Sequence, residues 1–181
     1  MAQNKAVFLD RDGVINHDTG YTSKIEDFEF IDGVFQACKR FIFQGYQIVV
    51  VTNQSGIARG FYSEDDFFKL TNWMIGQFDK HGIEIERVYF CPHHPTAGHG
   101  KYLKDCDCRK PNPGMLLRAA RELDLDLSAS IMIGDNLTDM QAGEKAGCKE
   151  CILVNERVLS PTLTQGYRTF PRLSDVTLGF H

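Results

Sequence analysis

The chain has 181 residues, 43% of them hydrophobic and 24% charged, which is typical of a globular protein rather than a disordered one. A formal net charge of −4 argues against a general nucleic-acid binder, which would normally carry a basic face. No apolar run approaches the roughly 20 residues that span a bilayer, and the first strand-like run begins too early to leave room for a signal peptide. We therefore expect one domain over residues 1–181, monomeric, located in the cytoplasm and without a membrane partner.

Strand-like and helix-like segments alternate along most of the chain. In order, we expect a strand at 6–10, a helix at 33–44, a strand at 47–53, a helix at 64–80, a strand at 87–91, a helix at 114–123, a strand at 130–135, a helix at 138–146 and a strand at 151–155. Ser63 and Asp66 resemble a capping box, and Gly45 and Gly147 are usual helix stops. Apolar strands separated by helices predict an α/β fold with a doubly wound parallel sheet that helices cover on both faces. The tail 156–181 has no clear pattern.

Two acidic residues directly follow the first strand. Asp10 and Asp12 are two positions apart, so their side chains should project to the same side of an extended chain and repel each other. Ligands of open α/β sheets bind beyond the carboxyl ends of the strands, where Asp135 also lies in sequence. If the first and fourth strands are neighbours, these carboxylates converge, and clustered oxygen ligands favour a hard cation such as Mg²⁺. We interpret Asp139 instead as an acid that caps the following helix.

The six cysteines form two groups. Cys38, Cys148 and Cys151 fall within helix or strand patterns, so we expect them in the core. The other three lie with several histidines in a long loop at 92–113, one of two long loops, the other being 16–32. Loops of this length in a compact domain tend to be functional.

That second group has the composition of a zinc site. Three thiolates and one imidazole make a closed tetrahedral set, typical of a structural zinc, and the candidates are Cys91, His93, Cys106 and Cys108. His94 and His99 are competing ligands that we rank below His93. A disulfide is the alternative, disfavoured in a reducing compartment.

Four segments, in this order, resemble the signatures of the haloacid-dehalogenase (HAD) superfamily of phosphatases: FLDRDGVIN, VVVTNQSG, CRKPNPGM and MIGDNLTDMQAG. Within it, NQSGIARG and CPHHP…CDCRKPNPGM resemble the heptose-1,7-bisphosphate 7-phosphatase branch. The resemblance extends to about residue 155. It implies a HAD-like Rossmannoid fold without a large cap domain, and a zinc-stabilised loop at about 91–110.

The resemblance also implies catalytic roles. Asp10 would be the nucleophile that forms an aspartyl-phosphate, and Asp12 would protonate the leaving group and then deprotonate water. Mg²⁺ would be held by Asp10, Asp135 and the backbone carbonyl of Asp12. Phosphoryl transfer also needs donors around the phosphoryl oxygens, for which Thr52 and Lys110 are the catalytic candidates.

Further residues are candidates for substrate binding: Asp18, Thr19, Gly20, Tyr21, Asn53, Gln54, Ser55, Arg109 and Asn136. Asn136 stands where some relatives have lysine, so this position departs from their pattern.

We therefore expect a Mg²⁺-dependent phosphatase that removes the C7 phosphate of D-glycero-D-manno-heptose 1,7-bisphosphate, in lipopolysaccharide or S-layer precursor synthesis. Its partner would be a small phosphorylated sugar, not nucleic acid. Histidinol-phosphate hydrolysis is an alternative on the same scaffold. A zinc-stabilised interaction module without catalysis is a third reading, but such a module would have little need of both acids in Asp10-Arg11-Asp12.

Overall fold

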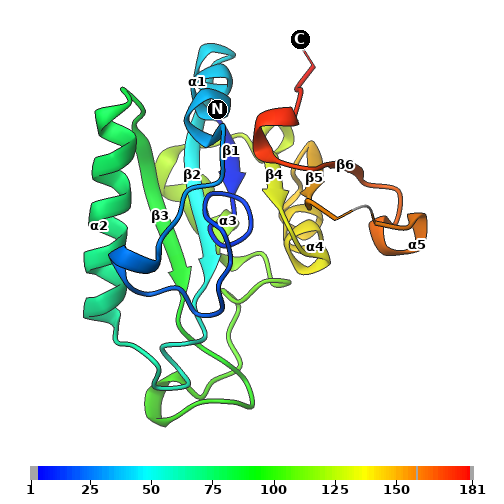
Figure 1. Cartoon of the computed structure of the whole chain (residues 1–181). Coiled ribbons are helices and arrows are strands. Elements are labelled where there is room, and N and C mark those ends of the chain that lie inside the picture. The colour runs from blue at the N-terminus through cyan, green and yellow to red at the C-terminus, as the bar shows by residue number, and fades with distance from the viewer. Residues whose placement is uncertain (1–3, 158, 180–181) are drawn as a thin grey trace.

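The computed structural model describes residues 4–157 and 159–179, which form one six-stranded sheet with helices on both faces (Figure 1). The strands are β1 (Lys5–Leu9), β2 (Tyr46–Asn53), β3 (Ile85–Cys91), β4 (Ile131–Gly134), β5 (Glu150–Val154) and β6 (Arg168–Phe170). All neighbouring strands are parallel, in the order β3-β2-β1-β4-β5-β6. The predicted doubly wound α/β fold is therefore confirmed. From β1 the chain continues to β2 and β3 on one side and then to β4, β5 and β6 on the other, so the strand order reverses at β1.

The longer helices match the predicted segments within one or two residues. They are α1 (Val34–Phe43), α2 (Glu64–Lys80), α3 (Gly114–Leu123) and α4 (Leu137–Ala146), and a short α5 (Pro161–Thr164) follows. The predicted capping box begins α2, because the Asp66 N–H donates to Ser63 Oγ at 3.1 Å and the Ser63 N–H donates to Asp66 Oδ2 at 3.0 Å.

Both faces of the sheet are buried, which explains why its central strands are continuously apolar. Val7 and Leu9 of β1 point into a core shared with α1 and α2, while Ala6 and Phe8 point into a second core shared with α3 and α4. Cys38 lies in the first core and Cys151 in the second, as predicted.

The tail contains elements that the sequence pattern did not predict. The three-residue strand β6 pairs with β5, and a 3₁₀ turn (Leu173–Asp175) lies against α1. Leu173 and Val176 are buried in the first core, and Arg40 of α1 donates to the Ser174 carbonyl at 2.8 Å. A three-residue edge strand without a continuous apolar run has too little pattern to be recognised in sequence.

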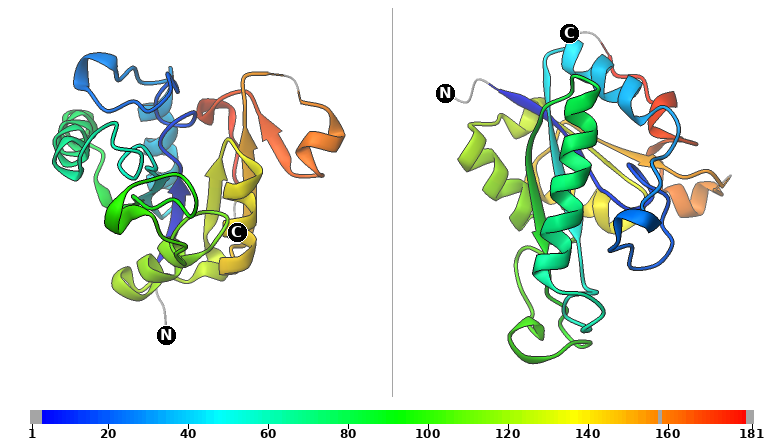
Figure 2. Two further views of the ribbon diagram at one scale, coloured as in Figure 1. Left: turned by 90° about the horizontal axis from the view of Figure 1, so that it is seen from below. Right: turned by 60° about the vertical axis from the view of Figure 1, so that its left-hand side comes forward.

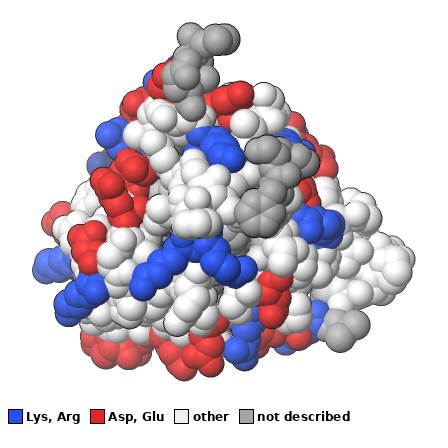
Figure 3. All heavy atoms as spheres, turned by 90° about the horizontal axis from the view of Figure 1, so that it is seen from above, with Lys and Arg blue, Asp and Glu red and all other residues white. Residues whose placement is uncertain are grey.

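The carboxyl ends of the strands and the amino ends form two different surfaces. The 92–113 loop lies beyond the carboxyl ends, below the sheet in Figure 1 and toward the viewer in the left view of Figure 2, and the 16–32 loop runs beside the sheet from the end of β1 to α1. At the amino ends, acidic and basic side chains are interspersed (Figure 3). Among the described residues, no helix has both the length and the apolar character that crossing a membrane requires.

Candidate active site

The register of β1 and β4 brings two of the predicted acids together. Leu9 lies opposite Ile133, so both strands end at the same level, and the Asp10 N–H donates to the Ile133 carbonyl at 3.1 Å. Asp135 follows β4 directly. Gly13 has a φ of +86°, and a Cβ at this position would lie 2.1 Å from Asp135 Oδ2, so any side chain here would displace that carboxylate.

A third carboxylate, that of Asp139, joins this pair. One oxygen from each of Asp10, Asp135 and Asp139 lies within 4.8 Å of the others. Asp139 Oδ2 accepts the N–H groups of Asp135 and Asn136, both at 3.1 Å, so its predicted role at the start of α4 is confirmed. Its other oxygen turns to the site.

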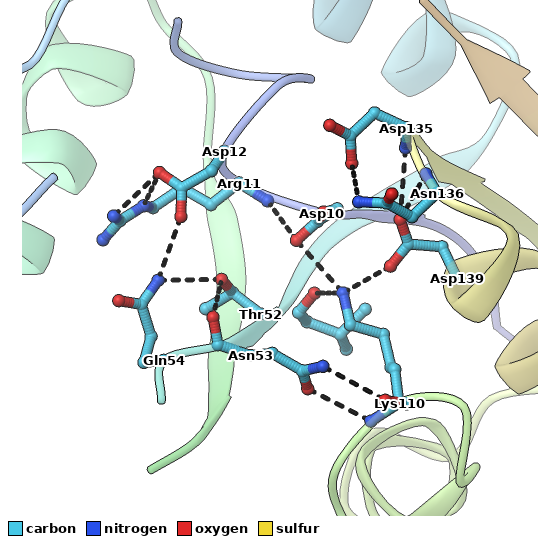
Figure 4. Close-up of polar contacts among 11 residues, drawn as sticks. Asp10, Arg11, Asp12, Thr52, Asn53, Gln54, Lys110, Asp135, Asn136 and Asp139 are labelled. Carbon is cyan, nitrogen blue, oxygen red and sulfur yellow. Dashed lines mark hydrogen bonds and ion pairs between the residues drawn. The ribbon is translucent and has the colours of Figure 1, made fainter. Parts of the chain in front are cut away.

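Lys110 neutralises part of this cluster (Figure 4). Lys110 is only 3% exposed. Its ammonium lies 2.7 Å from Asp139 Oδ1, 2.9 Å from the Val51 carbonyl and 3.0 Å from Asp10 Oδ1. These acceptors engage all three hydrogens of the ammonium. Burial alone would lower the pKa of Lys110, but the carboxylates of Asp10 and Asp139 raise it above its usual value, so the side chain is a cation.

The remaining negative charge is crowded. Burial, followed by the charge of Asp139, raises the pKa of Asp10 well above its usual value and that of Asp135 to about 7. Three carboxylates against one ammonium leave two negative charges when all are ionised. An oxygen-only cluster with this charge fits a hard divalent cation.

Asp12 does not share that crowding. Its Oδ1 accepts from Arg11 Nη2 at 2.9 Å, from Arg11 Nε at 3.2 Å and from Asn16 Nδ2 at 3.0 Å. Arg11, which sequence analysis did not single out, is only 1% exposed. The repulsion expected between Asp10 and Asp12 is therefore offset by a buried guanidinium on one of them (Figure 4).

Residues at the end of β2 make hydrogen bonds that hold neighbouring parts of the site in place. Thr52 is fully buried, and its hydroxyl accepts from Gln54 Nε2 at 2.9 Å. The Asn53 amide pairs reciprocally with the Lys110 backbone, donating to its carbonyl at 3.2 Å and accepting its N–H at 3.1 Å. Asn53 thus links β2 to the segment that carries Lys110.

These groups surround a cavity of about 160 Å³. It is lined by Asp10, Asp12, Asp18, Asn53, Lys110, Asp135, Asn136, Thr138 and Asp139. Of the other candidates from sequence, Thr52 and Gln54 are buried and do not line the cavity, and Ser55 lies on the turn that follows Gln54. Asn136 donates from its side chain to Asp135 Oδ1 at 3.1 Å.

Of residues 18–21, only Asp18 is among the residues that line the cavity. Residues 18–21 are an exposed turn in which Asp18 Oδ1 accepts the Gly20 N–H at 2.9 Å and Thr19 shares a hydrogen bond with Thr22. Tyr21 has a φ of +52°, and its ring lies 4.8 Å from that of Phe61.

Of the two arginines Arg59 and Arg109, only Arg109 was predicted from sequence. The Arg59 guanidinium is 5.9 Å from the centre of the Tyr21 ring, and Arg109 donates to the His93 carbonyl at 3.4 Å. Burial, then Arg109 and Arg59, lower the pKa of His94, so both guanidiniums act on one imidazole. Among the described residues, neither arginine has an acidic side chain within ion-pair distance. The IARG segment was noted in sequence, but nothing local distinguishes Arg59 from a solvated loop residue.

The predicted zinc ligands also meet. Single ligand atoms of Cys91, His93, Cys106 and Cys108 lie within 4.8 Å of one another, and the sulfur–sulfur distances run from 2.9 to 3.4 Å. Hydrogen bonding with Cys91 lowers the pKa of Cys108 to about 5, which favours the thiolate, the form that binds zinc.

The competing histidines lie outside that cluster. His94 Nδ1 accepts the N–H groups of Thr96 and Ala97 at 3.1 and 2.8 Å, and the His99 N–H donates to the Ala58 carbonyl at 2.8 Å.

A larger hollow of about 470 Å³ lies on the far side of this cluster, against Tyr89 and α3. Its lining contains single acids but neither Asp10 nor Asp135, so it does not share the carboxylate cluster of the smaller cavity.

Comparisons with known proteins agree with this geometry. A HAD-hydrolase-like family model matches residues 107–173. The chain is 54% identical to D-glycero-alpha-D-manno-heptose-1,7-bisphosphate 7-phosphatase of Campylobacter jejuni, over 85% of this chain and 84% of that protein. It is 52% identical to D-glycero-beta-D-manno-heptose-1,7-bisphosphate 7-phosphatase of Pasteurella multocida, over 83% and 81%.

Solved structures are similar as well. A HAD-like phosphatase from Mesorhizobium loti superposes with a TM-score of 0.81 at 39% identity, covering 89% of this chain and 78% of that one. D,D-heptose 1,7-bisphosphate phosphatase from B. bronchiseptica, complexed with magnesium and phosphate, superposes with a TM-score of 0.79 at 32% identity, covering 94% of each chain.

The fold, the paired acids at the end of β1 and these similarities define a phosphoric monoester hydrolase of the HAD superfamily. Within that class, the chain belongs to the family of D-glycero-manno-heptose-1,7-bisphosphate 7-phosphatases.

Proposed function

We propose that this enzyme removes the C7 phosphate of D-glycero-D-manno-heptose 1,7-bisphosphate through an aspartyl-phosphate on Asp10, in the cytoplasm and as a monomer. The observation that carries this proposal is the contrast between the two acids at the end of β1. Asp10 is buried within the Lys110 cluster, whereas Asp12 lies beside it on a separate guanidinium and lines the same cavity.

The two acids have complementary tasks in this mechanism. Asp10 attacks the phosphorus while the bond from phosphorus to the C7 oxygen breaks, and Asp12 gives that oxygen a proton. In the second step Asp12 takes a proton from a water molecule that attacks the aspartyl-phosphate, which releases phosphate and restores Asp10. Lys110 places a fixed positive charge 3.0 Å from Asp10 Oδ1, where charge accumulates on the transferred group.

The excess negative charge of the cluster supports a Mg²⁺ site. Asp10, Asp135 and the backbone carbonyl of Asp12 would hold the ion, with the Asp139 carboxylate nearby. When bound, Mg²⁺ would supply positive charge that lowers the repulsion between the Asp10 carboxylate and the anionic phosphate.

The cysteine cluster supports a structural zinc. Cys91, His93, Cys106 and Cys108 would hold it and so brace the loop that immediately precedes Arg109 and Lys110.

The size of the cavity favours the C7 phosphate over the C1 phosphate. A volume of about 160 Å³ accepts a phosphoryl group with a cation but leaves the sugar ring outside. A phosphate on the exocyclic C7 can enter ahead of the ring, whereas one attached to the ring carbon C1 would draw the ring in with it. The product would be a heptose 1-phosphate, consistent with a step in lipopolysaccharide or S-layer precursor synthesis.

The second phosphate requires fixed positive charge at the mouth. Arg109 was a substrate-binding candidate from sequence, and we add Arg59, whose guanidinium lies 5.9 Å from the centre of the Tyr21 ring. Neither arginine has an acidic partner among the described side chains. Histidinol phosphate carries an ammonium group instead, which the same two arginines would repel.

A substrate panel tests the proposal. Phosphate release with Mg²⁺ is measured for heptose 1,7-bisphosphate, heptose 7-phosphate and histidinol phosphate, with Asp10→Asn as the control that lacks the nucleophile. We expect kcat/KM to be highest for the bisphosphate, lower for the monophosphate and lowest for histidinol phosphate, and Asp10→Asn to be inactive on all three. A preference for histidinol phosphate would refute the heptose assignment. Release from no substrate would favour a non-catalytic zinc module.

A further inference from the structure

The carboxylate of Asp12 is held asymmetrically. Among the described residues, its Oδ1 accepts three N–H groups, two from Arg11 and one from Asn16, while its Oδ2 accepts one, from Gln54 Nε2 at 3.3 Å. Asp12 lines the cavity, whereas Arg11, Asn16 and Gln54 are buried behind it. Oδ2 is therefore the oxygen with a free lone pair.

The direction of the Gln54 amide is determined by its neighbours. The buried Tyr62 hydroxyl donates to Gln54 Oε1. Gln54 Nε2 then donates one hydrogen to Asp12 Oδ2 and the other to Thr52 Oγ1 at 2.9 Å. Asp12 Oδ2 can accept from Nε2 both as a carboxylate oxygen and when it carries a proton, because a hydroxyl oxygen also accepts. The arrangement with the nitrogen facing Asp12 and the carbonyl facing Tyr62 therefore suits both forms of Asp12.

The same chain orients the Thr52 hydroxyl. Since its oxygen accepts from Gln54, its own hydrogen remains free to be donated. Its contact with the Asn53 carbonyl is 3.5 Å long, longer than a normal hydrogen bond. Gln54 was predicted from sequence to bind substrate, but its side-chain amide is fully engaged inside the protein.

Arg11 is fixed on its outer side too. Its Nη2 donates to the Thr22 carbonyl at 2.7 Å, and the guanidinium lies 5.8 Å from the centre of the Phe28 ring. The guanidinium that holds Asp12 is thus anchored to the 16–32 loop.

We propose that Arg11, Gln54 and Tyr62 are positioning residues that hold Asp12 with Oδ2 facing the leaving-group oxygen. The inference rests on the proposed phosphatase mechanism. The enzyme enters the first step with Asp12 protonated on Oδ2, by the proton taken from water in the preceding turnover. Oδ2 gives this proton to the sugar oxygen as the phosphorus–oxygen bond breaks and the bond to Asp10 forms. In the second, Oδ2 takes a proton from the attacking water as the Asp10–phosphorus bond breaks.

The test uses Tyr62→Phe, because it removes one hydroxyl and keeps the ring. The matched control is Tyr89→Phe, which removes the hydroxyl of another buried tyrosine. That hydroxyl donates to Glu122 at 2.7 Å, and Tyr89 does not line the active-site cavity. Two substrates are compared with Mg²⁺ present: heptose 1,7-bisphosphate, whose alkoxide needs a proton to leave, and p-nitrophenyl phosphate, whose phenolate does not.

We expect Tyr62→Phe to lower kcat for the heptose substrate by about tenfold, a part of the roughly 10²–10⁴-fold that general acid catalysis contributes. The loss on p-nitrophenyl phosphate should be about twofold or less, with KM nearly unchanged for both, and Tyr89→Phe should match wild type. Equal losses on the two substrates would overturn the proposal, as would no loss beyond that of Tyr89→Phe.

A double-mutant cycle separates positioning from general loosening of the fold. If Tyr62 acts through Asp12, adding Tyr62→Phe to Asp12→Asn should change the rate on the heptose substrate by less than about twofold. An undiminished loss in that background would refute the inference. Arg11→Lys and Arg11→Met extend the cycle, and the lysine variant should lose less because it keeps a cation beside Asp12.

The same assays distinguish failure of the proposed substrate. If the wild type hydrolyses p-nitrophenyl phosphate but not the heptose bisphosphate, the substrate assignment fails. The leaving-group comparison is then made with whichever alkyl phosphate the wild type accepts, and equal losses there would still overturn the positioning role.

Discussion

The ammonium of Lys110 lies 2.7 Å from Asp139 Oδ1, and both side chains are 2% exposed. The two residues come from the end of the cysteine loop and from the first turn of α4, so this pair joins two segments at the active site. Its energetic value depends on what surrounds it, because the same ammonium also faces Asp10 and the Val51 carbonyl.

Replacing Lys110 with Met should therefore abolish turnover and destabilise the fold. The substitution leaves three clustered carboxylates without their ammonium, and breaking a buried pair in this way costs about 3–5 kcal/mol. Urea unfolding would measure the loss, and Mg²⁺ should restore part of the stability but not the turnover. Arg87→Met, which removes a solvent-exposed pair with Glu122, is the control and should cost less than about 1 kcal/mol. Equal losses in the free energy of unfolding for the two variants would contradict this prediction.

Stability without Mg²⁺ should fall as the pH rises. The pKa of Asp135 is raised from 3.8 to about 7 by burial and by Asp139, so the folded state binds more protons than the unfolded state between these values. The stabilising contribution of the protonated group is complete below 3.8 and is lost as the pH rises through about 7.

Added Mg²⁺ should reverse this trend, because it binds the ionised carboxylates. Melting temperatures at about pH 5.5 and about pH 7.5 check it, with a larger Mg²⁺ effect expected at the higher pH. In Asp135→Asn the pH dependence of the Mg²⁺ effect should be much weaker. A Mg²⁺ effect that shrinks as the pH rises would contradict the prediction.

Protein purified without chelators should contain about one zinc per chain. Cys106→Ser should lose that zinc, increase hydrogen exchange across residues 91–110 and lower the melting temperature, because metal binding at such sites is coupled to folding. Cys38→Ala, which changes a buried cysteine of the other core, should retain the metal. Absence of zinc from the wild type, or an intermolecular disulfide through Cys106, would argue against the site.

Arg59→Met and Arg109→Met should weaken recognition of the second phosphate. Each should raise KM for the bisphosphate about tenfold or more, with a much smaller change for heptose 7-phosphate, since losing a charge-assisted hydrogen bond costs about 1.5–3 kcal/mol. Arg118→Met, a substitution on the exposed face of α3, is the control. Parallel losses on both sugars would place these arginines away from the second phosphate.

The sequence alone was sufficient to predict the layers of the fold. Apolar runs, helix caps and glycine stops are local patterns, and they predicted five of the six strands and the four longer helices. The residues after the strands also predicted which groups would meet, because the carboxyl ends of parallel strands share one edge. Asp10 and Asp135 converge for this reason. The meeting of Cys91 with Cys108 was predicted instead from the zinc-like set of thiolates and imidazole and from the family resemblance.

Only the tertiary structure decided how the charges at that edge are paired. Lys110 is a hundred residues from Asp10 in sequence, and no local pattern shows that its ammonium also reaches Asp139. Arg11 has the sequence context of an exposed residue, yet it is buried against Asp12 under the 16–32 loop. The buried hydrogen bonds that connect Tyr62 to Gln54 and Gln54 to Asp12 could not be predicted from sequence either. Periodicity reports only which face of an element is buried, whereas ion pairs and hydrogen-bond directions depend on distances between elements, which exist only once the chain has folded.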